Sequence, residues 1–140
     1  MPVGYSGTPL PKKLGIGPGS QVAVLGKPDE YESLLGELPA GAKILSKPGK
    51  STNLVHAFVT ERRDLESHLN ELRVGLADTV PIWISWPKKA SKVPTTITED
   101  VIREVALPLG FVDIKVCAVS EIWSGLKLVV RKELRRAGAA

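Results

Sequence analysis

The chain has 140 residues, of which 43% are hydrophobic and 24% charged, with a formal net charge of +4 at pH 7. These values are ordinary for a globular protein and predict a single domain with one core. They exclude an intrinsically disordered chain, and the longest uncharged apolar run, residues 80–87, is too short to span a bilayer.

The start of the sequence lacks a basic stretch followed by an apolar core, so we expect no signal peptide. Cys117 is the single cysteine and cannot form an internal disulfide, which favours the reducing cytoplasm. The chain carries 15 acidic and 19 basic residues, and only 5% of its residues are aromatic. Nucleic-acid binding is not expected, because such modules usually combine a stronger basic excess with exposed aromatic side chains.

Glycine and proline are frequent in residues 1–20, which we interpret as an N-terminal arm. Residues 21–26 form an apolar run typical of a buried strand, and a helix is predicted over residues 27–38. Residues 43–46 resemble a short strand, and the polar residues 47–53 resemble a loop. Parallel neighbours need about a dozen linking residues. The short strand therefore either lies at an edge, with the chain crossing back in extended form, or is not a regular strand.

Residues 54–60 predict a second buried strand. The clearest helix covers residues 61–76, because its leucines recur every three or four positions and form one apolar stripe. A third apolar strand is expected over residues 80–87, followed by a polar loop over residues 88–95.

Thr96 and Glu99 have the spacing of a capping box and predict the start of the next helix, which ends near residue 109. Residues 112–119 and 126–131 are strand-like and close enough in sequence to form an antiparallel hairpin. The last residues, 133–140, are expected to be a basic, solvated tail.

Strands alternate with helices as far as residue 110. This order predicts a three-layer, Rossmann-like α/β fold with a mostly parallel sheet of about six strands, helices on both faces and a C-terminal antiparallel hairpin. We divide the chain into the arm (residues 1–20), one Rossmann-like domain (residues 21–132) and the tail (residues 133–140).

Ligands of open parallel sheets bind beyond the carboxyl ends of the strands. Three segments of this sequence are expected to meet there, one after each of the main strands. We take the following as candidate ligand-binding residues: Gly26, Lys27, Pro28, Thr60, Trp86, Lys88 and Lys89.

The candidates after the first strand and after the strand over residues 80–87 have structural alternatives. Lys27 either pairs with an anion or is a solvated lysine in a tight turn, and Pro28 removes one N–H donor from that turn. Trp86 either stacks on a planar ligand beside the two lysines or packs in the core, since both faces of such a sheet are covered.

Catalytic signals are few. His56 and Cys117 lie inside predicted strands, where buried structural roles are more common, and His68 lies on a helix face. The sequence has no glycine-rich nucleotide loop, no nucleophile elbow and no cluster with metal-ligand spacing. We therefore predict no catalytic residues, no metal and no cofactor.

Six short strings stand out, at residues 4–10, 12–16, 86–91, 98–100, 116–119 and 123–127. Together they resemble a bacterial family of unknown function, the domain-of-unknown-function family numbered three thousand and fifty-two. The resemblance covers nearly the whole chain, but the family carries no activity to transfer.

From Leu54 onward, the order of elements resembles the second half of a class I methyltransferase. Three departures from that pattern remove parts of the pocket for the methyl donor. The first loop lacks the glycine-rich motif, Ser46 stands where an acid would hold the ribose hydroxyls, and residues 47–53 replace a helix, strand and helix. S-adenosylmethionine binding is therefore disfavoured.

The favoured function is a non-catalytic, Rossmann-like module that binds a small anionic ligand or a protein partner at the carboxyl ends of the strands. One alternative is a divergent S-adenosylmethionine-dependent methyltransferase with a rebuilt pocket. Another is a structural or dimerisation protein. In each case we expect a cytoplasmic monomer or homodimer with no membrane association.

Overall fold

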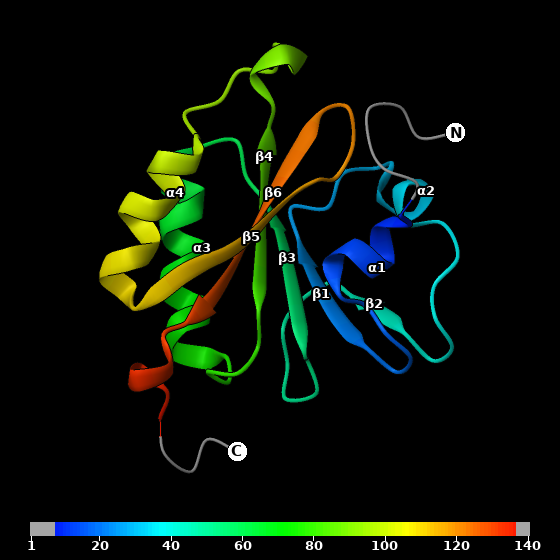
Figure 1. Cartoon of the computed structure of the whole chain (residues 1–140), viewed down its shortest axis with the longest axis horizontal. Coiled ribbons are helices and arrows are strands. Elements are labelled where there is room, and N and C mark those ends of the chain that lie inside the picture. The colour runs from blue at the N-terminus through cyan, green and yellow to red at the C-terminus, as the bar shows by residue number, and fades with distance from the viewer. Residues whose placement is uncertain (1–7, 137–140) are drawn as a thin grey trace.

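The computed structural model describes residues 8–136. Six strands form one sheet: β1 (Gln21–Leu25), β2 (Lys43–Leu45), β3 (Leu54–Phe58), β4 (Ile82–Pro87), β5 (Phe111–Ala118) and β6 (Trp123–Val130). Their order across the sheet is β2-β1-β3-β4-β6-β5 (Figure 1). The first four strands pair in parallel, whereas β6 runs antiparallel to both β4 and β5. The predicted sheet and its closing hairpin are confirmed.

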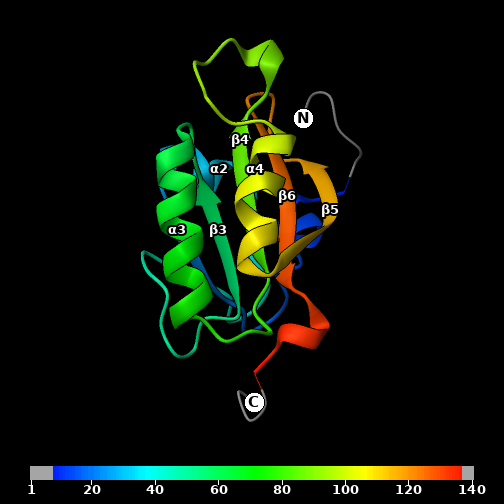
Figure 2. The same ribbon diagram turned by 90° about the vertical axis from the view of Figure 1, so that its left-hand side faces the viewer.

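Four helices cover this sheet: α1 (Leu10–Leu14), α2 (Tyr31–Leu35), α3 (Arg62–Gly75) and α4 (Glu99–Ala106). Short 3₁₀ turns follow at Lys89–Ser91, Leu107–Leu109 and Lys132–Leu134. Figures 1 and 2 show α1 and α2 on one face of the sheet and α3 beside α4 on the other. The three-layer α/β architecture expected from the sequence is therefore present. None of the helices in residues 8–136 has the length and apolar character needed to cross a bilayer.

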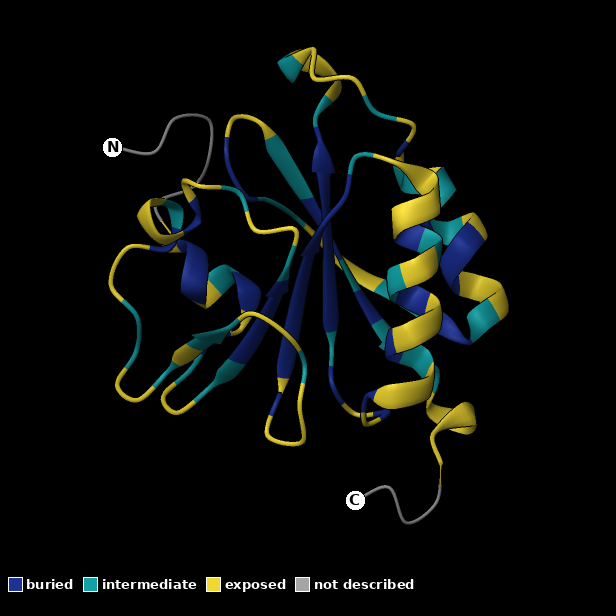
Figure 3. Ribbon diagram, turned by 180° about the vertical axis from the view of Figure 1, so that it is seen from behind, coloured by how far each residue is buried: buried dark blue, intermediate teal, exposed yellow. Residues whose placement is uncertain are grey.

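The core has two halves, one on each face of the sheet. β3 and β4 are buried along their whole lengths, as the dark central strands in Figure 3 show. The leucine stripe of α3 packs on the sheet as predicted, with Leu65 and Leu69 fully buried and Leu72 5% exposed. The other half of the core lies under α1 and α2.

β2 resolves the alternative that the sequence left open. It pairs with β1 in parallel at the edge of the sheet, and the chain returns to β3 without a helix. The return ends where the amide of Asn53 donates to the carbonyl of Gln21 at 3.0 Å and the Gln21 amide donates to Asn53 Oδ1 at 2.9 Å. The edge strand was therefore the correct alternative.

Two details of the predicted helices were wrong. α2 covers only Tyr31–Leu35, because the residues before it form a turn in which the Tyr31 amide donates to the Pro28 carbonyl. Thr98, not Thr96, caps α4 by accepting from the amide of Val101 at 3.1 Å. The Thr96 hydroxyl instead accepts from the first amide of α3, so a tertiary contact competes with the local capping pattern.

The described part of the predicted N-terminal arm belongs to the domain. Leu10, Leu14 and Ile16 are buried in the half of the core under α1 and α2. The Leu14 carbonyl also accepts a hydrogen bond from the indole of Trp83 at 2.9 Å. The segment from Leu10 to Ile16 therefore packs against the sheet through its apolar side chains, and residues 1–7 lie outside the described part of the chain.

The described residues of the predicted tail, 133–136, are exposed, as expected, and Arg136 also contacts the body of the domain. The carboxylate of Asp78 is 1% exposed and accepts from the backbone amide and guanidinium of Arg136, and from Arg73 at 3.1 Å. The hydrogen bonds from Arg136 lower the pKa of Asp78. Arg136 therefore links the last described residues to the segment after α3. Residues 137–140 lie outside the described part of the chain.

Candidate functional site

The carboxyl ends of β1, β3 and β4 lie along one edge of the sheet, beside the hairpin that joins β5 to β6 (Figure 1). All seven candidate ligand-binding residues lie in or directly before the loops at this edge. The fold therefore brings the predicted segments to one side of the molecule, but their side chains have different surroundings.

The loop after β1 is a closed turn. Gly26 has φ +64°, and a Cβ there would lie 2.5 Å from the carbonyl oxygen of Phe58, so only glycine fits. The ammonium of Lys27 pairs with the carboxylate of Glu32 and lowers its pKa, and the Pro28 carbonyl accepts from the amide of Tyr31. These contacts stabilise the turn and allow β1 to lie close to β3.

The end of β3 is covered by the loop that follows β4. The carbonyl of Thr60 accepts from the Thr95 hydroxyl at 2.7 Å and from the Thr96 amide at 3.0 Å. A carbonyl oxygen has two lone pairs, and both are occupied here. Thr60 therefore holds the two loops together.

Trp86 packs in the core between the sheet and the two long helices and is 8% exposed. Trp83, its neighbour on the opposite face of β4, is fully buried. The alternation along β4 is as predicted. The Trp86 ring lies in the core and does not form part of a surface site.

Lys88, Lys89 and Lys92 lie on a loop that projects beyond the sheet after β4 (Figure 2). We call residues 88–93 the basic loop. Lys89 and Lys92 are exposed and Lys88 is half-buried, and none of the three forms an ion pair within the described residues. Lys92 has φ +63°, the one positive value among the non-glycine residues of the described chain.

Hydrogen bonds fix the shape of the basic loop. The Lys88 amide donates to the carbonyl of Ile122 in the hairpin at 2.7 Å. The Ser91 hydroxyl donates to the Lys88 carbonyl at 2.6 Å and accepts from the Val93 amide at 3.2 Å. The loop is therefore preorganised, which lowers the entropy cost of binding.

A buried row of hydrogen-bonded side chains, Tyr31, His56 and Ser85, was not predicted. His56 is fully buried, with Nδ1 2.9 Å from the Tyr31 hydroxyl and Nε2 2.7 Å from Ser85 Oγ. Burial lowers the pKa of His56 to about 3 and raises the pKa of Tyr31. His56 is thus a satisfied core residue, as its place in a strand indicated.

The described residues offer little for metal or thiol chemistry. No group of three or more histidine, cysteine, aspartate or glutamate side chains in residues 8–136 could hold a metal ion. Cys117 is half-buried on the edge strand β5, and burial raises the pKa of its thiol. A raised pKa keeps a thiol protonated and unreactive.

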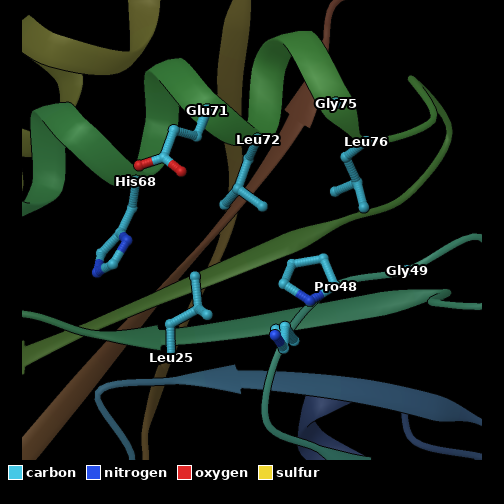
Figure 4. A pocket seen from close by; sticks show the side chains of 9 residues that line it. Leu25, Pro48, Gly49, His68, Glu71, Leu72, Gly75 and Leu76 are labelled. Carbon is cyan, nitrogen blue, oxygen red and sulfur yellow. The ribbon is translucent and has the colours of Figure 1, made fainter.

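A groove that sequence reasoning missed lies between α3 and the segment after β2 (Figure 4). It has a volume of about 380 Å³, within the range of small-molecule sites. Its signal in the sequence was the short segment 47–53, which lacks the helix that would otherwise cover this face.

Comparison with known proteins identifies the fold. No family model matches the chain, and no curated protein matches it. Among solved structures, a Sulfolobus solfataricus protein described as a type 11 methyltransferase matches with a TM-score of 0.64 and 15% identity, covering 94% of this chain and 95% of its own. The Methanococcus jannaschii pre-rRNA processing protein fibrillarin matches with a TM-score of 0.58 and 9% identity, covering 82% and 68%.

The B. subtilis tRNA methyltransferase TrmK matches with a TM-score of 0.57 and 12% identity, covering 90% of this chain and 67% of its own. Identities this low carry the fold but not an activity. The resemblance to the bacterial family of unknown function therefore stays a prediction. The chain has a class I methyltransferase-like Rossmann fold.

Proposed function

We propose that this protein is a non-catalytic binding module that engages an acidic protein surface through the basic loop at the strand-end edge. The observation that carries the proposal is the preorganised basic loop, whose three lysines project from the sheet without ion-pair partners in the described chain. Charged side chains placed in this way attract a partner of opposite charge.

The surroundings of the basic loop favour a protein over a small anion. Lys27 is already paired, Trp86 is buried, and both lone pairs of the Thr60 carbonyl are used. The remaining lysines lie on a projecting loop, and small-molecule sites are usually concave.

Exposed apolar side chains next to the lysines favour protein over nucleic acid. Val93 is 38% exposed, and Ile122, whose carbonyl bonds the loop, is 37% exposed. A mixed basic and apolar surface suits a protein interface, whereas single-stranded nucleic acids are usually gripped by aromatic rings.

The experiment compares binding of fluorescent poly-L-glutamate to the wild-type chain and to the triple variant Lys88→Ala, Lys89→Ala, Lys92→Ala. Three exposed ion pairs of about 0.5 kcal/mol each correspond to about a tenfold loss of affinity. A matched control removes the same charge elsewhere by Lys43→Ala, Lys115→Ala and Lys132→Ala, three exposed lysines outside the basic loop, and should bind as the wild type does.

Equal losses in the triple variant and the control would refute a specific role of the basic loop. Poly-U RNA that binds more tightly than poly-L-glutamate, and loses affinity in the same variant, would replace the protein partner with nucleic acid. Affinity for either probe should fall as salt is added.

A divergent methyltransferase is the second candidate, because several solved structures of the same fold are named as methyltransferases. The closed turn at Gly26 and the absence of an acid at Ser46 speak against a standard donor pocket. Saturating S-adenosylmethionine at about 100 times Kd would stabilise the native state by about 2.7 kcal/mol. A thermal shift of that size would favour this candidate over the binding module.

A structural or dimerisation role through the closing hairpin is the third proposal. β5 lies at the edge of the sheet and exposes Ile114 and Val116. A register shift between Asp113 and Lys115 disturbs this edge, and such bulges typically discourage pairing of edge strands. A dimer detected by light scattering and abolished by Val116→Lys would support this role.

A further inference from the structure

The groove beside α3 lies where no helix between β2 and β3 covers the sheet. α3 and α4 cover the central and hairpin side of the sheet, while the chain between β2 and β3 crosses back without a helix (Figures 2 and 4). The space between α3 and this crossing segment is consequently left open.

The walls of the groove are largely apolar. Leu72 of α3 and Leu76, which directly follows α3, point toward Leu25 and Pro48 on the opposite side (Figure 4). A second hollow, of about 410 Å³, shares Gly49, Gly75 and Leu76 with the first, so the groove continues toward the end of α3. An apolar ring or short chain would gain by leaving water here.

The rim of the groove is polar. Lys47 lines it and forms no ion pair within the described residues, and His68 has no hydrogen-bond partner there. Glu71 lies beside His68 and accepts a hydrogen bond from the Ser67 hydroxyl at 3.2 Å (Figure 4). The rim thus offers a cation for an anionic group and a carboxylate for a hydrogen-bond donor.

The crossing segment is held in place. The Gly49 amide donates to the Thr52 hydroxyl at 2.8 Å, and the Thr52 amide donates to the Gly49 carbonyl at 3.1 Å. Thr52 itself is 5% exposed, which ties the turn to the body of the domain. A rim with a fixed shape loses little entropy when a ligand binds.

We propose that this groove binds a small organic acid with an apolar body and one N–H or O–H donor. The body lies against Leu72 and Leu76, the acidic group faces Lys47, and the donor faces Glu71. This site is separate from the basic loop and independent of the function proposed for it.

Anilinonaphthalene sulfonate is a suitable probe, because it combines two apolar ring systems, a sulfonate and one N–H. Its fluorescence would be titrated with the full chain in a buffer where unfolding is cooperative, since the dye also binds molten states. We expect saturable binding to one site of the native protein.

The chain offers a matched pair of variants. A Cβ at Gly75 would meet no atom within 4 Å, so Gly75→Phe should fill the groove without disturbing the fold. Val74 is the preceding residue, is 77% exposed and does not line the groove, so Val74→Phe is its control. Removing the cation by Lys47→Ala should weaken binding about two- to threefold, the value of one exposed ion pair.

At least a tenfold loss in Gly75→Phe, with Val74→Phe unchanged, would support the site. Absence of saturable binding to the native protein, or wild-type binding by Gly75→Phe, would overturn it. Wild-type binding by Lys47→Ala would overturn the assignment of an acid as the ligand, and because Lys47 is exposed this variant also tests the site if Gly75→Phe does not fold.

Discussion

His56 should make the stability of this protein depend on pH in a way that a single substitution removes. The imidazole is fully buried between the Tyr31 hydroxyl and Ser85 Oγ, and its pKa is about 3 instead of 6.5. A neutral imidazole has one donor and one acceptor, which suits these two partners. A protonated one would be a buried charge with no carboxylate bonded to it.

The direction of this pH dependence is set by the unfolded chain, in which His56 takes up its proton at a higher pH than in the folded chain. His56 binds a proton near pH 6.5 in the unfolded chain and near pH 3 in the folded chain. The contribution of His56 to the free energy of unfolding is therefore complete above pH 6.5. It is lost as the pH falls toward 3, at about 1.4 kcal/mol per pH unit. The loss reaches about 2 kcal/mol at pH 5.

Urea unfolding of the wild type and of His56→Gln at pH 7 and pH 5 tests this value. Glutamine keeps a donor and an acceptor but does not titrate, and the carboxylates common to both proteins cancel in the comparison. The wild type should lose about 2 kcal/mol more than the variant. An equal loss, or an imidazole that titrates near pH 6.5 by NMR in the folded wild type, would refute the reasoning.

Three further substitutions test the packing. Asp78→Ala should cost about 1.5 kcal/mol in urea unfolding, because Arg73 and Arg136 lose their acceptor but stay accessible to water, and a cost below about 0.5 kcal/mol would contradict the anchoring of the chain end. In urea unfolding, Gly26→Ala should cost about 2 kcal/mol, because of its positive φ and its close carbonyl neighbour, whereas Gly17→Ala, in open space, should be nearly neutral. Thr98→Ala should cost about 1 kcal/mol as the loss of a helix cap, and an unchanged melting temperature would show that the cap is not needed.

The candidate site was only partly predictable. Sequence order located the loops at the carboxyl ends of the strands, because parallel strands place those ends at one edge. It could not show that Lys27 is paired, since the turn that brings Glu32 to it is set by the packing of Tyr31. The groove beside α3 was missed because it is formed by segments about twenty residues apart.

The local sequence pattern alone determined the α/β class, the α3 helix and the closing hairpin. Apolar runs and the leucine period act over a few residues, so they survive without knowledge of the rest of the chain. It also correctly limited β2 to two alternatives, since 47–53 is too short for a crossover helix.

Only the tertiary structure decided which alternatives hold. It placed β2 at the edge and Trp86 in the core. It also showed that Thr98 caps α4, because the Thr96 hydroxyl is bonded to the first amide of α3. It also anchored Arg136 on Asp78, 58 positions earlier in the chain. Each of these outcomes depends on a partner distant in sequence, and local pattern contains no information about which distant groups will meet.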